Sequence, residues 1–325
     1  MIRFLNTGDW HLRGTNPRNR IDLYIDAVEA KLKECYSLAI KWECKAIIVD
    51  GDVWDRPEVS ISVLLHFAGI LKESPVDIYV TPGNHDVYGY NVATYERSSL
   101  KLLELLVPQL RVLTDPSQGV LFDGVQLTFS PFTSKMDING YGYSPEGPAA
   151  ATQGVYKIHV SHGMLLDHTP PFDRYTDIQT VQTSANMVLT GHDHTGYEIY
   201  KRPDGVIFCN PGAIMRIAAS TTEVERTVQV ALITVDDGQG SIELIPLKCA
   251  KPGDEVLDRS KIEAEKARQY AMETFAAAIQ TSTGEKVILD INQIIETIAA
   301  EEKAPPYIVK AALEAIDAQR EKVKA

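Results

Sequence analysis

The sequence contains no long hydrophobic run and few cysteines. No apolar stretch reaches the ~18 residues that a membrane span requires. The N-terminal residues MIRFLNTGDWH become polar too soon for a signal peptide, so they are better interpreted as a first buried strand. The four cysteines show no CxxC spacing, which disfavours a disulfide framework and a cysteine zinc site. We therefore expect a cytoplasmic protein that does not associate with membranes.

Positive charge is also scarce. The chain has 44 Asp and Glu against 32 Lys and Arg, a net charge of -12. This balance counts against a general affinity for nucleic acid, which usually shows as a basic surface. A local basic cleft remains open, and bound divalent cations would offset some of the carboxylates.

The hydrophobic pattern predicts an α/β fold. Apolar strands at 2–6, 46–49 and 76–80 alternate with helices at 21–40, 60–71 and 95–106. This order is typical of βαβ units with a largely parallel sheet. Shorter strands follow at 125–130, 156–161, 187–190, 206–209 and 227–235. They predict a second, more antiparallel sheet packed on the first, so the fold class is two packed β-sheets flanked by helices.

The composition changes after Lys248, which divides the chain into a domain at 1–248 and a C-terminal region at 249–325. In that region residues 251–258 have the character of a linker. Helices are expected at 261–279, 290–302 and 307–323. The region is therefore a small helical appendage or a partner-binding module.

Five polar motifs follow predicted strands in order. They are Asp9-Trp10-His11, Gly51-Asp52, Gly83-Asn84-His85-Asp86, His162-Gly163 and Gly191-His192-Asp193-His194. Each motif alone could be an ordinary turn, because Asn, His and Asp also form turns. Together, the five should converge on one edge of the core, where α/β sheets bind their ligands.

The motifs offer seven candidate metal ligands with mixed oxygen and nitrogen donors. These are Asp9, His11, Asp52, Asn84, His162, His192 and His194. Such donors suit Mn, Fe or Zn better than Mg or Ca. Seven ligands exceed one tetrahedral site and suit two metals that share a carboxylate, with Asp52 as the candidate bridge. Two such cations can clamp a phosphoryl group and activate water. His159, by contrast, alternates with apolar neighbours and is expected to point to a sheet face.

This series of motifs resembles the calcineurin-like metallophosphoesterase superfamily over roughly residues 1–245. The resemblance implies an αββα sandwich with two divalent metal ions, Mn²⁺ being favoured over Fe or Zn. It implies that Asp9, His11, Asp52 and His194 hold one metal, and that Asp52, Asn84, His162 and His192 hold the other. It implies that His85 protonates the leaving group or stabilises the transition state, and that Asp86 orients His85 through a hydrogen bond.

Within the superfamily the chain is most similar to the SbcD-type DNA repair nucleases. The similar segments are Gly-Asp-Val-Trp-Asp-Arg-Pro at 51–57 and Asn-Pro-Gly-Ala-Ile-Met-Arg at 210–216, although Ala213 stands where family members usually have Ser. This similarity implies a Mn-dependent DNA exo/endonuclease and a homodimer. It also implies that the C-terminal helices dock on a coiled-coil SbcC-type ATPase.

Two other functions remain open. One is a phosphatase or phosphodiesterase for small phosphorylated molecules or phosphoproteins, which suits the acidic net charge. The other is a non-catalytic scaffold, but no motif ligand is lost. For DNA, the candidate phosphate contacts near the motif loops are Arg13, Arg18, Arg20 and Arg216, with Arg56 and Arg97 as further candidates. Tyr88 and Tyr90 either stack on a base or pack beneath their loop.

Overall fold

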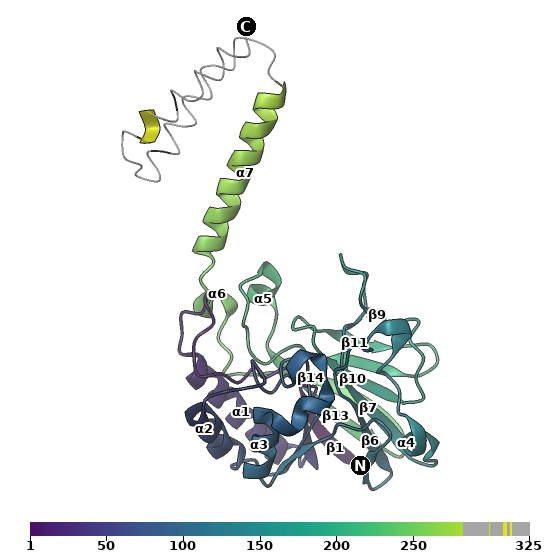
Figure 1. Ribbon diagram of the computed structural model, residues 1–325. Coiled ribbons are helices and arrows are strands. Elements are labelled where there is room, and N and C mark those ends of the chain that lie inside the picture. The colour runs from purple at the N-terminus through teal and green to yellow at the C-terminus, as the bar shows by residue number, and fades with distance from the viewer. Residues whose placement is uncertain (282–298, 300–307, 311–312, 314–325) are drawn as a thin grey trace. The chain divides into compact units, whose positions relative to one another are not determined.

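The computed structural model describes residues 1–281, 299, 308–310 and 313. It divides into two compact units, Met1–Asp258 and Arg259–Ala325. Figure 1 shows the first unit with its two β-sheets and flanking helices. No helix in the described part of the chain is both long and apolar enough to cross a membrane.

The first sheet has six strands. Their spatial order is β14 (Gln239–Pro246), β13 (Gln229–Asp236), β1 (Ile2–Thr7), β2 (Ala46–Val49), β3 (Asp77–Val80) and β4 (Leu110–Val112). The strands from β1 to β4 run parallel, as the alternation with helices predicts. The strands β13 and β14 extend the sheet in antiparallel fashion.

The second sheet also has six strands. Their spatial order is β11 (Tyr197–Lys201), β12 (Ile207–Asn210), β10 (Met187–Gly191), β7 (Tyr156–His162), β6 (Val125–Ser130) and β5 (Gly119–Phe122). The prediction that this second sheet is more antiparallel than the first is wrong for its centre, where β12, β10, β7 and β6 are parallel. Long connections after β6 and β7 allow each chain segment to return to the same end, which a short hairpin cannot do.

Three helices cover the outer face of the first sheet: α1 (Tyr24–Lys41), α2 (Ile61–Leu71) and α3 (Ser99–Leu106). They lie together on one side of the sheets (Figure 1). The Ser60 side chain accepts a hydrogen bond from Val63 N and so caps α2, as a serine at this position does in many helices. Buried residues of α1 recur at helical spacing, with Val28, Leu32 and Cys35 facing the core.

The central strands bury both faces. In β1 Phe4 packs between the sheets, whereas Leu5 packs under the helices. In β2 Ile48 packs between the sheets and Ile47 packs under the helices, because successive side chains of a strand point to opposite faces. Two hydrophobic layers thus hold the parallel strands in fixed positions, which confirms the predicted class of two packed sheets flanked by helices.

The outer face of the second sheet is covered mainly by the segment between β6 and β10. Phe132 and Met136 from this segment pack with Val188 and Phe208 of the sheet. The remaining short elements are η1 (Tyr88–Tyr90), η2 (Val92–Arg97), η3 (Ile138–Gly140), α4 (Gly147–Ala151), β8 (Leu165–Leu166), β9 (Thr176–Asp177) and α5 (Thr221–Glu225).

The expected linker at 251–258 is folded. It contains α6 (Gly253–Val256), and the side chains of Val256 and Leu257 are buried. The first compact unit therefore includes ten residues beyond the predicted boundary at Lys248. The second unit begins with α7 (Ser260–Thr281), which confirms the helix expected at 261–279. The helices expected at 290–302 and 307–323 lie almost entirely outside the described residues.

Candidate metal centre

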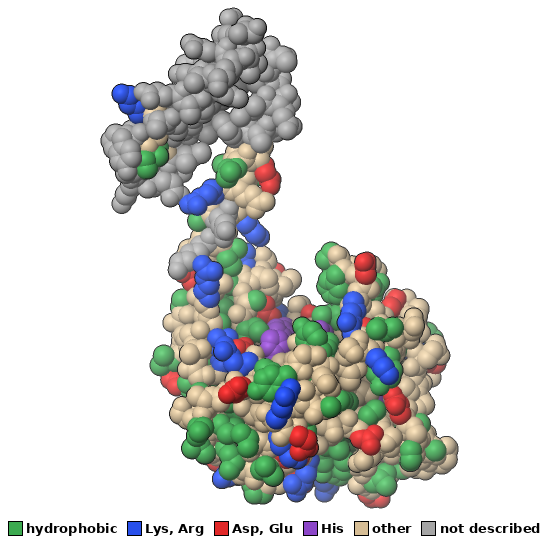
Figure 2. Space-filling view, viewed as in Figure 1, with side chains coloured by type: hydrophobic (Ala, Val, Ile, Leu, Met, Phe, Trp, Pro, Cys, Tyr) green, Lys and Arg blue, Asp and Glu red, His purple; other side chains and the backbone are tan. Residues whose placement is uncertain are grey.

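The seven candidate ligands follow the carboxyl ends of parallel strands. The first sheet supplies Asp9 and His11 after β1, Asp52 after β2 and Asn84 after β3, and the second supplies His162 at the end of β7 and His192 and His194 after β10. These strand ends meet at one edge of the two sheets, as the motif order predicts. Figure 2 shows histidine side chains reaching the surface together on one face.

Asp9, His11, Asp52 and His194 form the first group. One ligand atom from each lies within 4.8 Å of the others. The Nε2 atoms of His11 and His194 are 2.9 Å apart, so two imidazole nitrogens point at the same small space. Asp9 and His11 are fully buried, and the Nδ1 atom of His11 has no hydrogen-bond partner among the described residues. Two carboxylates and two imidazoles facing one point fit a divalent cation.

Asp52, His162 and His192 form the second group, with ligand atoms again within 4.8 Å of one another. The Nδ1 atom of His162 lies 2.7 Å from the Asp50 carbonyl oxygen, which places the ring proton on Nδ1. Its Nε2 atom then faces two oxygens, Asn84 Oδ1 at 3.0 Å and Asp52 Oδ2 at 3.2 Å. An imidazole nitrogen, an amide oxygen and a carboxylate oxygen that face one small space suit a shared positive charge, so these residues fit a second metal.

Asp52 belongs to both groups. Its Oδ2 atom lies 3.8 Å from His11 Nε2 and 3.2 Å from His162 Nε2. Its Oδ1 atom accepts a hydrogen bond of 2.8 Å from the backbone N–H of His85. The carboxylate is thus held between the two ligand sets, which is the position that a bridging ligand requires.

The protonation states suit metal binding. Burial alone would raise the pKa of Asp52, but His162 and His11 outweigh burial. The pKa therefore lies below its usual value, and the carboxyl stays ionised. Burial lowers the pKa of His11 well below its usual value and that of His192 to about 3, which leaves both rings neutral. Burial lowers the pKa of His162, but Asp52 outweighs it and raises that pKa to about 10. A positive charge is therefore favoured beside Asp52, either as a proton or as a metal ion.

Unusual backbone angles hold three of the ligands. His11, Asp52 and His192 have φ values of 46°, 47° and 77°, in the left-handed region that non-glycine residues rarely adopt. Such strain persists only where surrounding structure fixes it, and it is concentrated at functional sites. Gly83 has a different role, since a Cβ atom there would collide with the Asp52 carboxylate.

His85 lies beside the two groups. Its Nδ1 atom is 2.8 Å from the carbonyl oxygen of Asp55, and its ring meets that of His11 edge to face at 4.9 Å. Hydrogen bonding at Nδ1 leaves Nε2 as the ring nitrogen without a protein partner in the described part of the chain. This half-buried imidazole can therefore exchange a proton with a molecule bound at the centre.

The structure corrects the expectation for Asp86. This buried carboxylate accepts hydrogen bonds from the backbone N–H groups of Val53, Trp54 and Gly83, at 3.2, 2.9 and 2.9 Å. It therefore ties the loop after β2 to the loop after β3. The group that orients His85 is the Asp55 carbonyl oxygen.

The four candidate phosphate-binding arginines differ in their surroundings. Arg13 forms a hydrogen bond and an ion pair with the Asp55 side chain, each at 3.1 Å, and Asp55 in turn contacts His85 through its carbonyl oxygen. Arg18 is exposed.

Arg20 and Arg216 do not have the surroundings expected of phosphate contacts. Their side chains are buried, at 7% and 4% exposure, and their donors bind other groups of the protein. Arg20 binds Asp22 and the Arg216 carbonyl oxygen. Arg216 binds three further backbone carbonyl oxygens.

Sequence reasoning missed part of the site. The carbonyl oxygens of Asp50 and Asp55 orient two histidines, yet backbone atoms leave no signal in residue identity. It also missed Phe132, whose ring lies 5.3 Å from that of His192 and 5.4 Å from that of Tyr90. The one available signal was the position of Phe132 directly after a predicted strand. Tyr90 itself is 56% exposed, so the rings of Phe132 and Tyr90 lie in sequence between the candidate ligand His192 and solvent.

His159 behaves as predicted. It is fully buried in β7 and its ring nitrogens contact Thr128 Oγ1 at 2.8 Å and the Gly142 carbonyl oxygen at 3.1 Å. Both nitrogens are thus engaged away from the ligand groups.

Comparison with known proteins gives distant structural similarities and one family match. A search of curated proteins found no matching sequence. Similar solved structures include a dimetal phosphatase from Danio rerio, at 12% identity over 75% of this chain and 96% of that one, with a TM-score of 0.45. Another is TT1561 of Thermus thermophilus, at 14% identity over 75% and 98% of the two chains, with a TM-score of 0.45. A third is GAP50, the anchor in the inner membrane complex of Plasmodium, at 9% identity over 77% and 86%, with a TM-score of 0.47.

The family model described as calcineurin-like phosphoesterase matches residues 2–196. This match spans more than half of the chain and includes all seven candidate ligands and His85. The protein belongs to the calcineurin-like phosphoesterase family.

Proposed function

We propose that this phosphoesterase is a Mn-dependent DNA nuclease of SbcD type that acts in DNA repair or processing in the cytoplasm. The observation that carries the chemistry is the pair of ligand groups that share Asp52, with His85 beside them. The nuclease assignment itself is supported by the segments at 51–57 and 210–216, which resemble that branch of the family.

The residues present would hold two divalent cations. Asp9, His11, Asp52 and His194 would hold one, and Asp52, Asn84, His162 and His192 the other. The mixture of imidazole, amide and carboxylate donors suits Mn, Fe or Zn, and we propose Mn²⁺. When bound, such a pair polarises the phosphoryl group and activates water for in-line attack.

His85 would serve the leaving group. The Asp55 carbonyl oxygen fixes the proton of the His85 ring on Nδ1, and the hydrogen bond from the His85 backbone N–H to Asp52 fixes the residue beside the two ligand groups. The Nε2 atom can therefore carry a second proton to the departing alkoxide oxygen. The Arg13 and Asp55 pair holds the loop that supplies the carbonyl oxygen.

Contacts to DNA would come from the loop that follows the first ligands and from the loop that contains Tyr90. Arg13 and Arg18 follow the first ligands in sequence and would bind backbone phosphates. Tyr90 is exposed and backed by Phe132, so it offers a platform on which a base could stack. We further propose that the C-terminal region docks on a coiled-coil SbcC-type ATPase and that the chain forms a homodimer.

A phosphatase or phosphodiesterase for small phosphorylated molecules or phosphoproteins is the second candidate. The observation in its favour is the net charge of -12, which repels a polyanion such as DNA. The same two ligand groups and His85 would serve this reaction.

Hydrolysis assays separate the two functions. Linear double-stranded and single-stranded DNA would be incubated with the protein and Mn²⁺, with a small phosphodiester in parallel and His85→Ala as the control. Degradation of DNA that requires metal and is lost in the variant would support the nuclease. Turnover of the small ester alone would reject the nuclease and favour the second candidate.

A further inference from the structure

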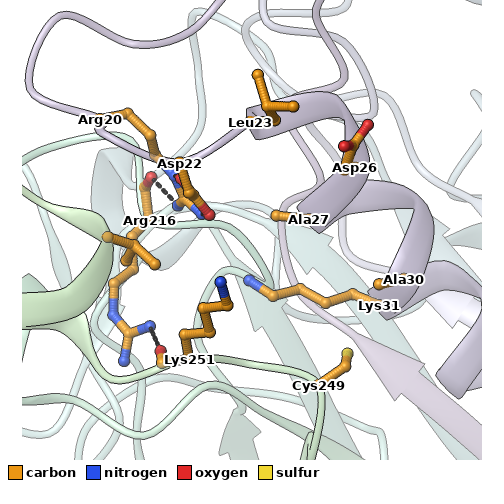
Figure 3. A pocket seen from close by; sticks show the side chains of 11 residues that line it. Arg20, Asp22, Leu23, Asp26, Ala27, Ala30, Lys31, Arg216, Cys249 and Lys251 are labelled. Atoms are coloured by element: carbon orange, nitrogen blue, oxygen red, sulfur yellow. Dashed lines mark hydrogen bonds and ion pairs between the residues drawn. The ribbon is translucent and has the colours of Figure 1, made fainter.

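A cavity of about 420 Å³ lies against the first turns of α1. It is lined by the loop before α1, by α1 itself and by residues from 216 to 256, and none of the candidate metal ligands lines it. Figure 3 shows its side chains. The volume falls within the range of known small-molecule sites.

The lining is rich in cations for so acidic a protein. Arg20, Lys31, Arg216 and Lys251 all line the cavity. Figure 3 shows the ammonium groups of Lys31 and Lys251 directed into the same space. The carboxylates in the lining are Asp22, which pairs with Arg20 at 2.6 Å, and the exposed Asp26.

Lys31 is the unusual member of this set. The residue is 3% exposed, and its Nζ atom donates to the Ile214 carbonyl oxygen at 2.6 Å and contacts Met215 Sδ at 3.3 Å. An ammonium group has three donors, and a thioether sulfur is a weak acceptor. The lysine is therefore buried with its donors incompletely satisfied, on the wall of a cavity that a ligand could enter.

The positive charge is also incompletely balanced. Lys31, Arg216 and Lys251 have no ion pair within 4.0 Å among the described residues. Burial, together with the nearby positive charges of Arg20 and Arg216, lowers the pKa of Lys31 to about 7. A buried charge without a counterion is costly, so an anion in the cavity would relieve both the burial cost and the repulsion among the cations.

We propose that this cavity binds a small phosphate-bearing anion, separately from the metal centre. A phosphate group presents several acceptor oxygens to ammonium groups that approach from different sides, and lysine is a common phosphate ligand. The chemistry is shared by inorganic phosphate and by the phosphate of a mononucleotide, for which the cavity has room. The site does not depend on which phosphoester the metal centre hydrolyses.

Titration calorimetry of the full-length chain tests the proposal. Metals are first removed by chelation, so that phosphate has no metal to bind. Inorganic phosphate and adenosine monophosphate are then titrated separately into the wild type, Lys251→Ala, Lys31→Met and Lys248→Ala. Lys248 is exposed, lies three residues from Lys251 and does not line the cavity, so it provides the matched control.

Saturable binding of one or both anions is expected in the wild type and in Lys248→Ala. Binding should weaken by at least about tenfold in Lys251→Ala and Lys31→Met, because each loses a charged hydrogen bond to the ligand. If Lys31→Met does not fold, the exposed Lys251 still decides the result. Equal affinity in Lys251→Ala and Lys248→Ala, or no binding by folded wild type, would overturn the proposal. Binding of a single-stranded oligonucleotide but of neither small anion would also overturn it.

Cys249 provides a second readout. It lines the cavity and is exposed, whereas Cys35, Cys44 and Cys209 are buried. A bound anion should slow alkylation of Cys249 in the wild type and in Lys248→Ala, but not in Lys251→Ala. Alkylation at an unchanged rate with saturating anion would show that the ligand lies elsewhere.

Discussion

At the scale of single residues, the candidate centre depends on a few atoms whose environments differ sharply. Asp52 is ionised between two histidines, whereas burial raises the pKa of the neighbouring Asp50 well above its usual value. Both carboxyls are buried, but His162 and His11 lower the pKa of Asp52, whereas the nearby Asp9 carboxyl adds to the effect of burial at Asp50. Asp52 therefore carries its negative charge at the space that the two ligand groups face.

Replacing His85 should separate catalysis from metal binding. We expect His85→Ala to lower kcat for a small phosphodiester by about 10²–10⁴-fold, because a positioned proton donor contributes an effect of this size. The metal content should not change, since His85 belongs to neither ligand group. Kinetics and elemental analysis of the purified variant measure both. His66→Ala, at an exposed histidine, is the control, and loss of metal in His85→Ala would make His85 a ligand.

His159 predicts a pH dependence of stability. Burial lowers its pKa from 6.5 to about 4 in the folded chain, so between these values the unfolded chain binds more protons. Stability should therefore fall as the pH drops through 6.5 towards 4, by up to about 3 kcal/mol from this residue. Urea unfolding of the wild type and His159→Gln at pH 7.5 and 4.5 measures the effect. The variant should lose less stability between the two pH values, and equal losses would contradict the assignment.

At the scale of elements, the segment after β12 explains why the donors of two candidate arginines, Arg20 and Arg216, are engaged within the protein. The carbonyl oxygens of Ala213 and Met215 accept from Arg226, at 2.7 and 3.1 Å. Those of Ile214 and Arg216 accept from Lys31 and Arg20, at 2.6 and 2.9 Å. The backbone N–H groups of Ala213 and Ile214 donate to the carbonyl oxygens of His194 and Asp9. The cations thus hold a segment that supports two candidate ligands.

The loop after β3 predicts a difference between substrates. Stacking of a base on an aromatic ring contributes ~1–3 kcal/mol, so Tyr90→Ala should raise KM for a single-stranded oligonucleotide at least about fivefold. Hydrolysis of a small phosphodiester should be unchanged, because Phe132 lies between the Tyr90 ring and the candidate ligand His192. Tyr90→Phe keeps the ring and should resemble the wild type. A KM that rises equally for both substrates would indicate damage to the centre rather than lost stacking.

The predictability of the fold differed between elements. Continuous apolar runs such as 46–49 identified the buried strands, because only strands enclosed on both faces tolerate them. Strand direction in the second sheet could not be predicted from the alternation of short strands. Its crossovers are mostly irregular and contain only short helices such as η3 and α4, so the usual signal of a parallel sheet, a long amphipathic helix between strands, is missing. The edge strand β14 alternates exposed and half-buried residues and was also missed.

At the scale of the whole molecule, all candidate ligands, His85 and the cationic cavity lie in the unit Met1–Asp258. A chain truncated after Asp258 should therefore retain bound metal and hydrolysis of a small phosphodiester. Elemental analysis and steady-state kinetics of the truncated and full-length chains measure this. Loss of metal from a truncated chain that remains folded would show that the second unit completes the centre.

The site was predicted more completely than its surroundings. The order of five polar motifs at strand ends identified every member of both ligand groups, because parallel strands must present their carboxyl ends together. The roles of Arg20, Arg216 and Asp86 were not predictable in this way. Their partners are mainly backbone groups from segments distant in sequence, which residue types do not reveal.

Metal stoichiometry tests the central claim, a two-metal centre bridged by Asp52, most directly. Chelated protein would be titrated with Mn²⁺ by calorimetry and the bound metal counted by elemental analysis, for the wild type, Asp52→Asn and Asp55→Asn. Asp55 is the matched control, since it lies three residues away and belongs to neither ligand group. We expect two ions in the wild type and in Asp55→Asn, and loss of both in Asp52→Asn. One ion in the wild type, or two in Asp52→Asn, would contradict the account.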